Sequence, residues 1–449
     1  MIEKIEKITL LDLIKATNGK ILFGNDAVVE SISTSSNETD NNTLFIPIKG
    51  ERFDAHDFIE DALKNGAKGY ICDREIINKD ASYAVLVEDT KKALMDIASF
   101  YIDKFKTDVI ALTGSVGKTT TKEFVANVLM QKYDTIRTQK NYNNEIGMPF
   151  TVFSINSKTE KAVIEMGMSN FNEIEKYSDA SKPNVAIITN IGVSHIEYLK
   201  SQEGILKAKC EIFSGMKENG VAILNGDDKF LWTLKDKLNF KTIFFGIENK
   251  KCDVLAENVK TYEDKLEFTI NGTDFEINIM GKHNVYNALA SYCVAKLYNM
   301  EDTLIQKGYK SFKSDGIRQS ICEKDGIKFI NDCYNASPQS VKSYIDVLCN
   351  FEGRKIAILG DMLELGENTN IYHKEVGEYI NEKEVAMLLT VGNLTKNIYN
   401  EVKCEKKHFD NNAEIVDYLK QNAKKGDIIL IKGSRGMKME EIFKLFNER

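Results

Sequence analysis

The segment TGSVGKTTTKE (113–123) places two glycines, a lysine and several hydroxyl side chains in the order that suits a phosphate-binding loop. It follows the short apolar run DVIALTG and opens TTKEFVANVLMQK, where Phe124, Val125, Val128 and Leu129 share one helical face. The glycines let the backbone curl so that successive N–H groups point at phosphate oxygens, and the positive end of the helix adds to that field. The sequence therefore predicts a nucleoside triphosphate site formed by Thr113, Gly114, Ser115, Val116, Gly117, Lys118, Thr119 and Thr120.

Lys118 and Thr119 carry the chemistry of this loop. The lysine can follow the β and γ phosphates, and the threonine hydroxyl is placed to hold Mg²⁺. Only two residues separate the glycines, whereas the general pattern has four. A plain glycine turn is the alternative, but such a turn has no need of Gly-Lys-Thr-Thr directly at a helix start.

Glu165, His195 and Lys209 are further candidates in the same region. Glu165 ends the apolar run KAVIE, and His195 lies just past the next one, NVAIITNIG. Taken singly, Glu165 is a solvated strand end, His195 a hydrogen-bonded loop histidine and Lys209 a surface charge on a helix. Because the carboxyl ends of parallel strands meet at one sheet edge, we expect Glu165 and His195 beside the phosphate loop.

Composition limits the class of protein. A chain of 449 residues with 43% apolar and 28% charged residues is typical of a globular protein with about three domains. The net charge of −7 argues against a general nucleic-acid binder. The N-terminus lacks signal-peptide features and no apolar run reaches ~20 residues, so we expect a cytoplasmic protein without membrane insertion. The eight cysteines form no Cys-x-x-Cys pair, which disfavours a zinc site.

The pattern of apolar runs changes along the chain and predicts an α/β protein of three domains. Residues 1–105 hold short mixed elements, which indicates a small mixed α/β domain. Residues 106–315 repeat strand-then-helix units whose apolar strands suit a parallel sheet covered on both faces, as in a phosphate-loop ATPase domain. Residues 316–449 contain KIAILG, AMLLTVG and DIILIKG, which predict a Rossmann-like doubly wound domain.

The shortened loop followed by TTTKE resembles the Mur ligases of peptidoglycan precursor synthesis, and the resemblance continues along nearly the whole chain. The last domain resembles the subgroup that adds D-alanyl-D-alanine to UDP-N-acetylmuramoyl-tripeptide. The Asp-Asn-Pro-Arg motif of the ligases that add the third residue does not occur in the sequence. The matching segments are NYNNEIGMP (141–149), EMGMSN (165–170), TNIGVSHIEYL (189–199), KAKCEIF (207–213), GKHNVYNALA (281–290), NDCYNASPQS (331–340), ILGDMLELGE (358–367) and KGSRGMKME (432–440).

This resemblance implies a ligase that uses ATP and Mg²⁺, and we expect a monomer. ATP would phosphorylate the terminal carboxylate of UDP-N-acetylmuramoyl-tripeptide, and the amine of D-alanyl-D-alanine would attack the acyl phosphate. The family's catalytic positions are matched by Lys118, Glu165, His195 and Lys209. Its metal positions are matched by Thr119, Glu165, His195 and Lys209, the last as a carbamate formed with CO₂, which turns a cation into an anionic oxygen ligand.

Other roles are also implied by the resemblance. His283, Asn284 and Asn287 would contact the adenine, although an N-cap role competes for Asn284. Arg318 would reach the ATP when the domains close, and Asp332 would face the ribose or that arginine. The expected substrate contacts are Ser36 and Lys49 for the uridine nucleotide, and Asn143, Asn144, Tyr334, Asn335, Asp361 and Glu364 for the peptides.

The sequence departs from the family pattern at several positions. Ser35-Ser36-Asn37 stands where Asp-Ser-Arg is usual, and the missing arginine removes a charged donor fork from the uridine site. Asn331 and Ser337 replace an aspartate and an asparagine. A relative adding a different amino acid or dipeptide, a folylpolyglutamate-type enzyme and a catalytically silent nucleotide-binding scaffold are therefore the alternatives.

Overall fold

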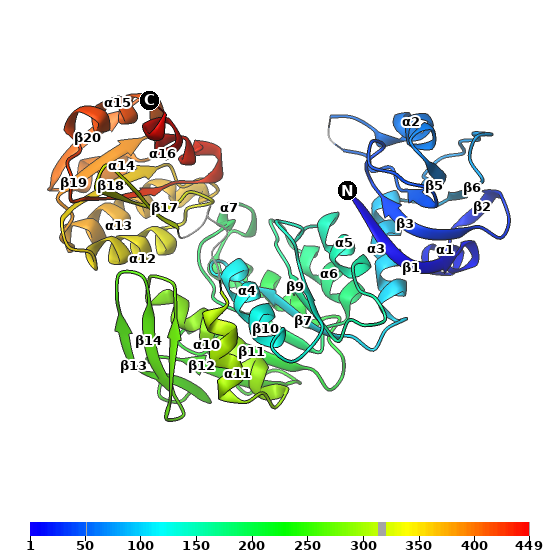
Figure 1. Ribbon diagram of the computed structural model, residues 1–449, viewed down its shortest axis with the longest axis horizontal. Coiled ribbons are helices and arrows are strands. Elements are labelled where there is room, and N and C mark those ends of the chain that lie inside the picture. The colour runs from blue at the N-terminus through cyan, green and yellow to red at the C-terminus, as the bar shows by residue number, and fades with distance from the viewer. Residues whose placement is uncertain (51, 313–319, 449) are drawn as a thin grey trace.

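Three sheets, each built from a different stretch of the chain, organise the molecule in Figure 1. The computed structural model describes residues 1–50, 52–312 and 320–448. The α/β class and the three sheet-centred parts are confirmed. None of the helices among the described residues is both long enough and apolar enough to cross a membrane.

The N-terminal sheet has the strand order β1-β3-β4-β5-β6-β2, with parallel inner strands and an antiparallel strand at each edge. Strand β4 ends at Phe45, because the chain leaves the sheet before Pro47, which has no N–H to donate. The elements are β1 (Ile2–Thr9), α1 (Leu10–Thr17), β2 (Lys20–Phe23), β3 (Val28–Ser33), β4 (Thr43–Phe45), η1 (Ala55–Phe58), α2 (Ile59–Lys64), β5 (Ala67–Cys72), β6 (Tyr83–Leu86) and α3 (Thr90–Ile102).

The central sheet has nine strands in the order β15-β14-β13-β12-β11-β10-β7-β9-β8. The strands from β8 to β12 are parallel, and the helices cover both faces. The sheet then continues into the antiparallel strands β13, β14 and β15, which the prediction of a parallel sheet did not include. The strands are β7 (Asp108–Thr113), β8 (Thr135–Arg137), β9 (Lys161–Glu165), β10 (Val185–Ile188), β11 (Val221–Asn225), β12 (Lys241–Gly246), β13 (Val254–Thr261), β14 (Leu266–Ile270) and β15 (Thr273–Ile277).

Strand β7 is buried on both sides, as its continuous apolar sequence predicts. Val109 and Ala111 point into one core cluster, and Ile110 and Leu112 point into the other. The helices that cover these faces are α4 (Lys118–Leu129), α5 (Gly147–Phe153), α6 (Glu173–Ser181), α7 (Ile196–Leu199), α8 (Gln202–Cys210), η2 (Glu211–Phe213), α9 (Lys229–Trp232), α10 (His283–Leu297) and α11 (Asp302–Lys310).

The C-terminal sheet has the order β16-β17-β21-β18-β19-β20 and is parallel except for the edge strand β16. The three predicted apolar runs are β18, β21 and β19, and they lie side by side at its centre. The elements are β16 (Ser320–Lys324), β17 (Ile327–Asp332), α12 (Pro338–Cys349), β18 (Arg354–Gly360), η3 (Gly366–Asn368), α13 (Thr369–Asn381), β19 (Met387–Val391), α14 (Lys396–Glu401), β20 (Glu405–Phe409), α15 (Asn412–Asn422), β21 (Asp427–Lys432), η4 (Arg435–Met437) and α16 (Glu440–Asn447).

Helix α3 joins the N-terminal sheet to the central domain through one continuous apolar core. Tyr101 is fully buried at this joint and packs edge-on against Phe105 and Phe153. Its hydroxyl donates to the carbonyl of Ile155 at 2.9 Å and accepts from the N–H of Glu6 at 2.9 Å. The hydroxyl is therefore satisfied on both sides, which an apolar interface requires.

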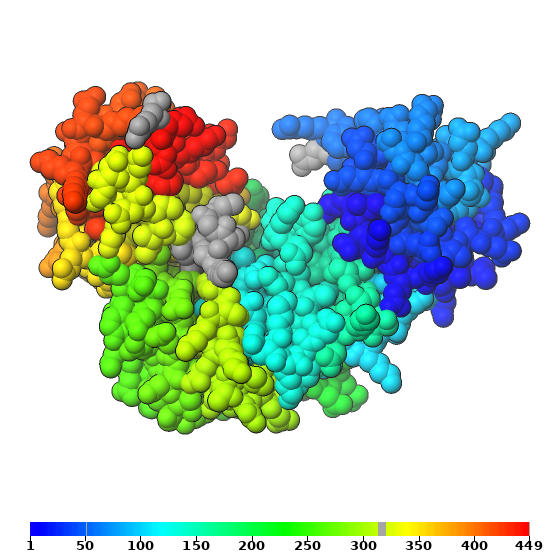
Figure 2. Space-filling view, viewed as in Figure 1, coloured from blue at the N-terminus to red at the C-terminus, as the bar shows by residue number. Residues whose placement is uncertain are grey.

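The C-terminal domain contacts the central domain at the other end of the molecule. Figure 2 shows the blue N-terminal domain and the red C-terminal domain facing each other across a hollow above the central domain. Gly192, in the loop after β10, lies against Gln339 of α12, and a Cβ at this glycine would come within 2.2 Å of the Gln339 Oε1. A side chain at this position would therefore displace Gln339 from the joint.

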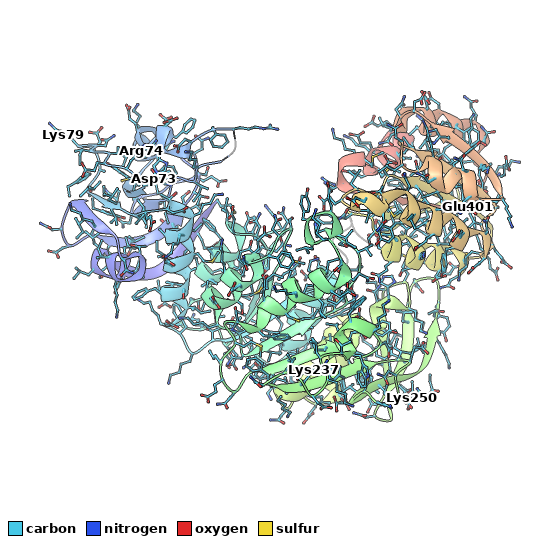
Figure 3. All side chains as sticks on the ribbon, turned by 180° about the vertical axis from the view of Figure 1, so that it is seen from behind. Asp73, Arg74, Lys79, Lys237, Lys250 and Glu401 are labelled. Carbon is cyan, nitrogen blue, oxygen red and sulfur yellow. The ribbon has the colours of Figure 1, made fainter. Side chains whose placement is uncertain are left out.

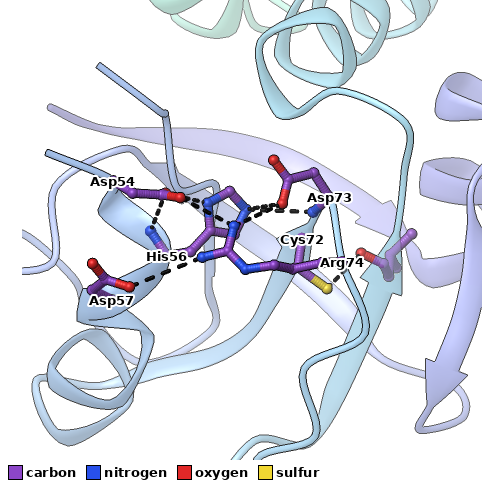
Figure 4. A network of polar contacts seen from close by, with 7 residues as sticks. Asp54, His56, Asp57, Cys72, Asp73 and Arg74 are labelled. Atoms are coloured by element: carbon purple, nitrogen blue, oxygen red, sulfur yellow. Dashed lines mark hydrogen bonds and ion pairs between the residues drawn. The ribbon is translucent and has the colours of Figure 1, made fainter. Parts of the chain in front are cut away.

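A polar network surrounds His56 (Figure 4). One of its members, Asp54, forms a β-bridge with Lys49. The His56 ring is buried; its Nδ1 lies 2.6 Å from an Asp54 oxygen, and its Nε2 accepts from the N–H of Asp73 at 3.3 Å. Arg74 donates to Asp54 at 3.0 Å and to Asp73 at 3.1 Å. Figure 3 shows Asp73 and Arg74 at the opposite end of the molecule from Glu401 in the C-terminal domain.

Partial burial opposes ionisation of Asp54, but hydrogen bonds from His56 and Arg74 outweigh it and lower its pKa to about 2. A carboxylate whose pKa is depressed on folding stabilises the folded state above its unfolded pKa, and that stabilisation is lost as the pH falls through the folded pKa. The unmodified protein should therefore unfold at a higher temperature than Asp54→Asn. The difference between the two thermal unfolding midpoints should be constant above about pH 5 and shrink between about pH 4 and pH 2.

The matched control is Asp57→Asn, because Asp57 is mostly exposed and lies 3.9 Å from Arg74. Its midpoint should follow the unmodified protein across the same pH range. An Asp54→Asn difference that stays constant down to pH 2 would contradict this account of the network.

Candidate active site

The phosphate loop lies between β7 and α4, at the carboxyl edge of the central sheet. Gly114 and Gly117 both have positive φ, at 156° and 85°. A Cβ at Gly114 would lie 1.8 Å from the Thr189 Oγ1, and one at Gly117 would lie 2.6 Å from the Asn287 Oδ1. Both glycines are therefore required by conformation and by space.

Residues just after strand β10 hold the loop in place through hydrogen bonds, and the Lys118 side chain folds back over the loop. The N–H of Val116 donates to the Asn190 Oδ1 at 2.9 Å, and the N–H of Gly192 donates to the Ser115 Oγ at 2.8 Å. The Lys118 ammonium donates to the carbonyl of Gly114 at 2.8 Å. The cation thus lies inside the curve of the loop, at the start of α4, where a phosphate chain would be bound.

Glu165 ends β9 and is buried beside the loop. One carboxylate oxygen accepts from the Asn143 amide at 2.8 Å. The other, Oε2, is buried without a hydrogen-bond partner among the described residues, and the Lys122 ammonium lies 3.9 Å from it, beyond hydrogen-bond distance. A buried, unsatisfied anionic oxygen facing a phosphate loop has the chemistry of a Mg²⁺ ligand, so the residues present fit that ion.

His195 follows β10 and precedes α7, with a left-handed backbone at φ 61°. Its Nδ1 lies 2.7 Å from the Oε2 of Glu364 in the C-terminal domain, although the ring N–H is not well aligned on that oxygen. The contact with His195 lowers the pKa of Glu364. A predicted metal residue and a predicted peptide-binding residue from two domains are therefore in direct contact.

Lys209 lies on α8 and is almost fully buried. Burial, together with the positive charge of Lys118, lowers the pKa of Lys209 well below its usual value. The amine therefore holds its proton less tightly than an exposed lysine does. The interpretation of Lys209 as an ordinary solvated surface charge is wrong.

One cavity of about 810 Å³ brings the central and C-terminal domains together. It is bounded by the phosphate loop and the ends of β9, β10 and β11 on one side, and by the β17–α12 connection on the other. Its lining includes the predicted residues Ser115, Val116, Gly117, Lys118, Thr119, Thr120, Asn143, Asn144, Glu165, His195, His283, Asp332, Tyr334 and Asn335. Nucleotide and peptide candidates from three parts of the sequence thus face a single space.

The residues predicted to contact adenine divide into two groups. His283 lines the cavity, and burial lowers its pKa to about 4, so its ring is neutral at pH 7. Asn284 and Asn287 share a helix face as predicted, but they bond to each other at 2.8 Å, to the Met280 carbonyl and to the Thr121 hydroxyl. Neither is among the residues that line the cavity, and Asn284 lies inside α10, so its N-cap interpretation is wrong.

In the C-terminal domain, Asp332 is paired with Lys432, a buried residue that sequence reasoning missed. The Lys432 ammonium also donates to the Asn335 carbonyl at 2.9 Å, so it fixes the loop that carries Asp332 and Tyr334. Lys432 opens the motif KGSRG at the end of β21, and β21 is the direct neighbour of β17. That position after an apolar strand is the signal that could have identified it.

Three of the remaining predicted residues lie elsewhere. The Asp361 carboxylate accepts from the N–H groups of Leu394 and Thr395 at 3.0 and 2.8 Å, which gives it a structural task at the start of α14. Ser36 and Lys49 belong to the N-terminal domain and are not among the lining residues of this cavity. Arg318 lies outside the described residues.

The loop after β11 contributes lining residues that were not predicted. Asn225, Asp227 and Asp228 face the cavity, and the Tyr286 hydroxyl donates to Asp227 at 2.8 Å. The sequence signal was NGDD directly after the run VAIL, at the same sheet edge as the phosphate loop. Ser337, which replaces an expected asparagine, accepts from the N–H of Ser340 and caps α12.

Comparison with known protein families gives three matches in chain order. Residues 28–101 match the model described as Mur ligase family, catalytic domain. Residues 112–295 match the Mur ligase middle domain, and residues 318–435 match the Mur ligase, glutamate ligase domain.

Individual relatives match along almost the whole chain. The UDP-N-acetylmuramoyl-tripeptide–D-alanyl-D-alanine ligase of Bacillus subtilis is 39% identical, over 99% of this chain and 98% of that protein. The crystal structure of MurF from Acinetobacter baumannii superposes with a TM-score of 0.94 at 29% identity, over 99% of this chain and 100% of that one. MurF ligase from Thermotoga maritima in complex with ADP superposes with a TM-score of 0.84 at 30% identity, over 92% and 96%. Because three successive domain matches and these full-length similarities agree with the geometry of the cavity, the chain belongs to the Mur ligase family.

Proposed function

We propose that this protein joins D-alanyl-D-alanine to UDP-N-acetylmuramoyl-tripeptide in cytoplasmic peptidoglycan precursor synthesis, as a monomer that uses ATP and Mg²⁺. The observation that carries the proposal is the shared cavity, in which Lys118, Glu165 and His195 face the Asp332–Tyr334 loop of another domain. Relatives that carry this activity as their name match nearly the entire chain. A silent nucleotide-binding scaffold would have no need of so complete a set of charged groups.

ATP would lie on the phosphate loop, with its γ-phosphate near Lys118 and its base toward His283. The neutral His283 ring suits an uncharged base edge. The tripeptide carboxylate attacks the γ-phosphorus, the bond to ADP breaks, and an acyl phosphate forms. Lys118 reduces the repulsion between the two anions as they approach.

The metal residues would be Thr119, Glu165, His195 and a carbamylated Lys209. When bound there, Mg²⁺ would withdraw negative charge from the phosphate and carboxylate oxygens. The lowered pKa of Lys209 favours the neutral amine, whose lone pair can attack CO₂, giving a carbamate and releasing one proton. The product is an anion that adds to the oxygen ligands of the site.

The second half of the reaction involves the C-terminal domain. Asn335, Tyr334 and the residues near α12 face the cavity opposite Glu165, so we place D-alanyl-D-alanine between them. Asn143 and Asn144 lie on the side of the tripeptide, and Ser36 and Lys49 of the N-terminal domain serve its uridine nucleotide. The dipeptide amine attacks the acyl carbon and phosphate leaves.

The acceptor specificity can be tested directly. ADP release should require UDP-N-acetylmuramoyl-tripeptide and D-alanyl-D-alanine together, and mass spectrometry should show the pentapeptide product. The tripeptide is supplied with lysine and with diaminopimelate at its third position. Turnover without the dipeptide would contradict the assignment. A product carrying a different amino acid or dipeptide would also contradict it and would favour a relative with another acceptor.

Lys118→Ala should lower the rate of acyl-phosphate formation by about 100-fold or more, because one group that stabilises transition-state charge is lost. Rapid-quench trapping of the acyl phosphate measures this step, and circular dichroism checks that the fold is kept. Lys158→Ala, which changes an exposed lysine of the same domain, is the control and should behave like the unmodified protein. A fully active Lys118→Ala protein would overturn the role of the loop.

Lys209→Ala should also lose about 100-fold or more of the activity. The unmodified protein, prepared without CO₂ at low pH, should recover activity on addition of bicarbonate. Lys207→Ala is the matched control on the same helix, where the Lys207 side chain is exposed and lies over the ring of Phe171. Full activity of Lys209→Ala, or no response of the depleted protein to bicarbonate, would remove the carbamate from the scheme.

A further inference from the structure

A small patch of the domain joint includes the predicted metal residue His195. The loop after β10 and helix α7 meet the segment around η3 of the C-terminal domain. The His195 Nδ1 lies 2.7 Å from the Glu364 Oε2, and Gly366 lies so close to Glu197 that a Cβ there would come within 3.1 Å of its Cα. The two segments therefore dock backbone to backbone, with one charged contact beside them.

Both residues of the charged contact have unusual backbones. His195 has φ 61° and Glu364 has φ 62°, a left-handed conformation that side chains other than glycine rarely adopt. Such conformations persist where the surrounding structure holds them, and they concentrate at functional sites. Here both occur at one contact between two domains.

The ring of His195 has two nitrogens with separate tasks. One face of the residue lines the cavity with Glu165 and the phosphate loop, while Nδ1 faces Glu364. A histidine that binds a metal generally donates its other ring N–H to a carboxylate or a carbonyl, which fixes the tautomer and the ring orientation. If the proton is on Nδ1, the Nε2 lone pair is available to a metal ion.

We propose that Glu364 is the positioning residue for His195, so that docking of the C-terminal domain completes the metal site in the central domain. The inference rests on the metal site of the proposed function. It assigns Glu364 to His195 in place of the peptide contact expected from the sequence.

This arrangement makes metal binding and domain docking mutually dependent. Whatever fixes His195 in its metal-binding tautomer also favours the docked domain, and by linkage a bound metal favours docking to the same extent. An isolated contact between a histidine ring and a half-exposed glutamate contributes little to stability on its own. A merely structural pair would therefore leave both the metal affinity and the His195 tautomer unchanged.

The test uses the full chain and Mn²⁺ alone, with free Mn²⁺ measured by electron paramagnetic resonance. Glu364→Ala should weaken Mn²⁺ binding by about 10-fold or more, the effect expected when the partner of a metal-binding histidine is removed. The Mn²⁺ affinity of Glu364→Gln should lie between those of the unmodified protein and Glu364→Ala, because its amide oxygen can still accept from Nδ1–H. Glu367→Ala changes an exposed glutamate three residues along the same segment and should bind Mn²⁺ like the unmodified protein.

A second measurement separates a positioning role from a structural one. The chain has five histidines, so ¹⁵N-histidine labelling with a His195→Gln reference identifies the His195 ring signals. The unmodified protein should show the Nδ1–H tautomer, and Glu364→Ala should show a mixture. Unchanged Mn²⁺ affinity in Glu364→Ala, or weaker affinity without a change of tautomer, overturns the inference. Unchanged affinity in His195→Gln would instead overturn the metal site of the proposed function, and this inference with it.

Discussion

Repulsion between a carboxylate and a triphosphate is the constraint on which the arrangement of this molecule depends. The two anions must approach to bonding distance in a space from which the protein excludes much of the water, where their repulsion is stronger than in solution. The central domain meets this constraint by concentrating cationic groups and the proposed metal residues at one sheet edge. Lys118 lies in the curve of the phosphate loop, Lys209 is buried behind it, and Glu165 and His195 face the same cavity.

The other two domains serve this edge in different ways. The N-terminal sheet shares an apolar core with the central domain, so the two are joined as one body through α3. The C-terminal domain instead touches the central domain through fewer residues: Val193 and Met280 pack into the C-terminal apolar core, Gln339 lies against Gly192, and Glu364 lies against His195. Contacts of this kind can open without exposing a large apolar core. This suits a domain that must move away to admit one peptide as substrate and release another as product.

Much of the fold and part of the site could be predicted from the sequence, because local chemistry decides them. The phosphate loop is specified by its own glycines, and the strands that precede Thr113, Glu165 and His195 are continuous apolar runs. The antiparallel strands β13, β14 and β15 were missed, because alternating half-buried strands give a weak signal. The partners of Asn287, Asp361 and Glu364 could not be predicted, since each includes a residue distant in sequence. Lys432 was missed for the same reason: its partner Asp332 is 100 residues away.

The shared core around Tyr101 has a consequence for substrate choice. If the uridine end of the substrate is held by the N-terminal domain, the span from that anchor to Lys118 is fixed by the packing of α3 on α5 and α6. This fixed span then sets the length of the substrate that can reach Lys118. A peptide one residue shorter would leave its terminal carboxylate short of the phosphate loop, so length can select the substrate before any peptide side chain is read.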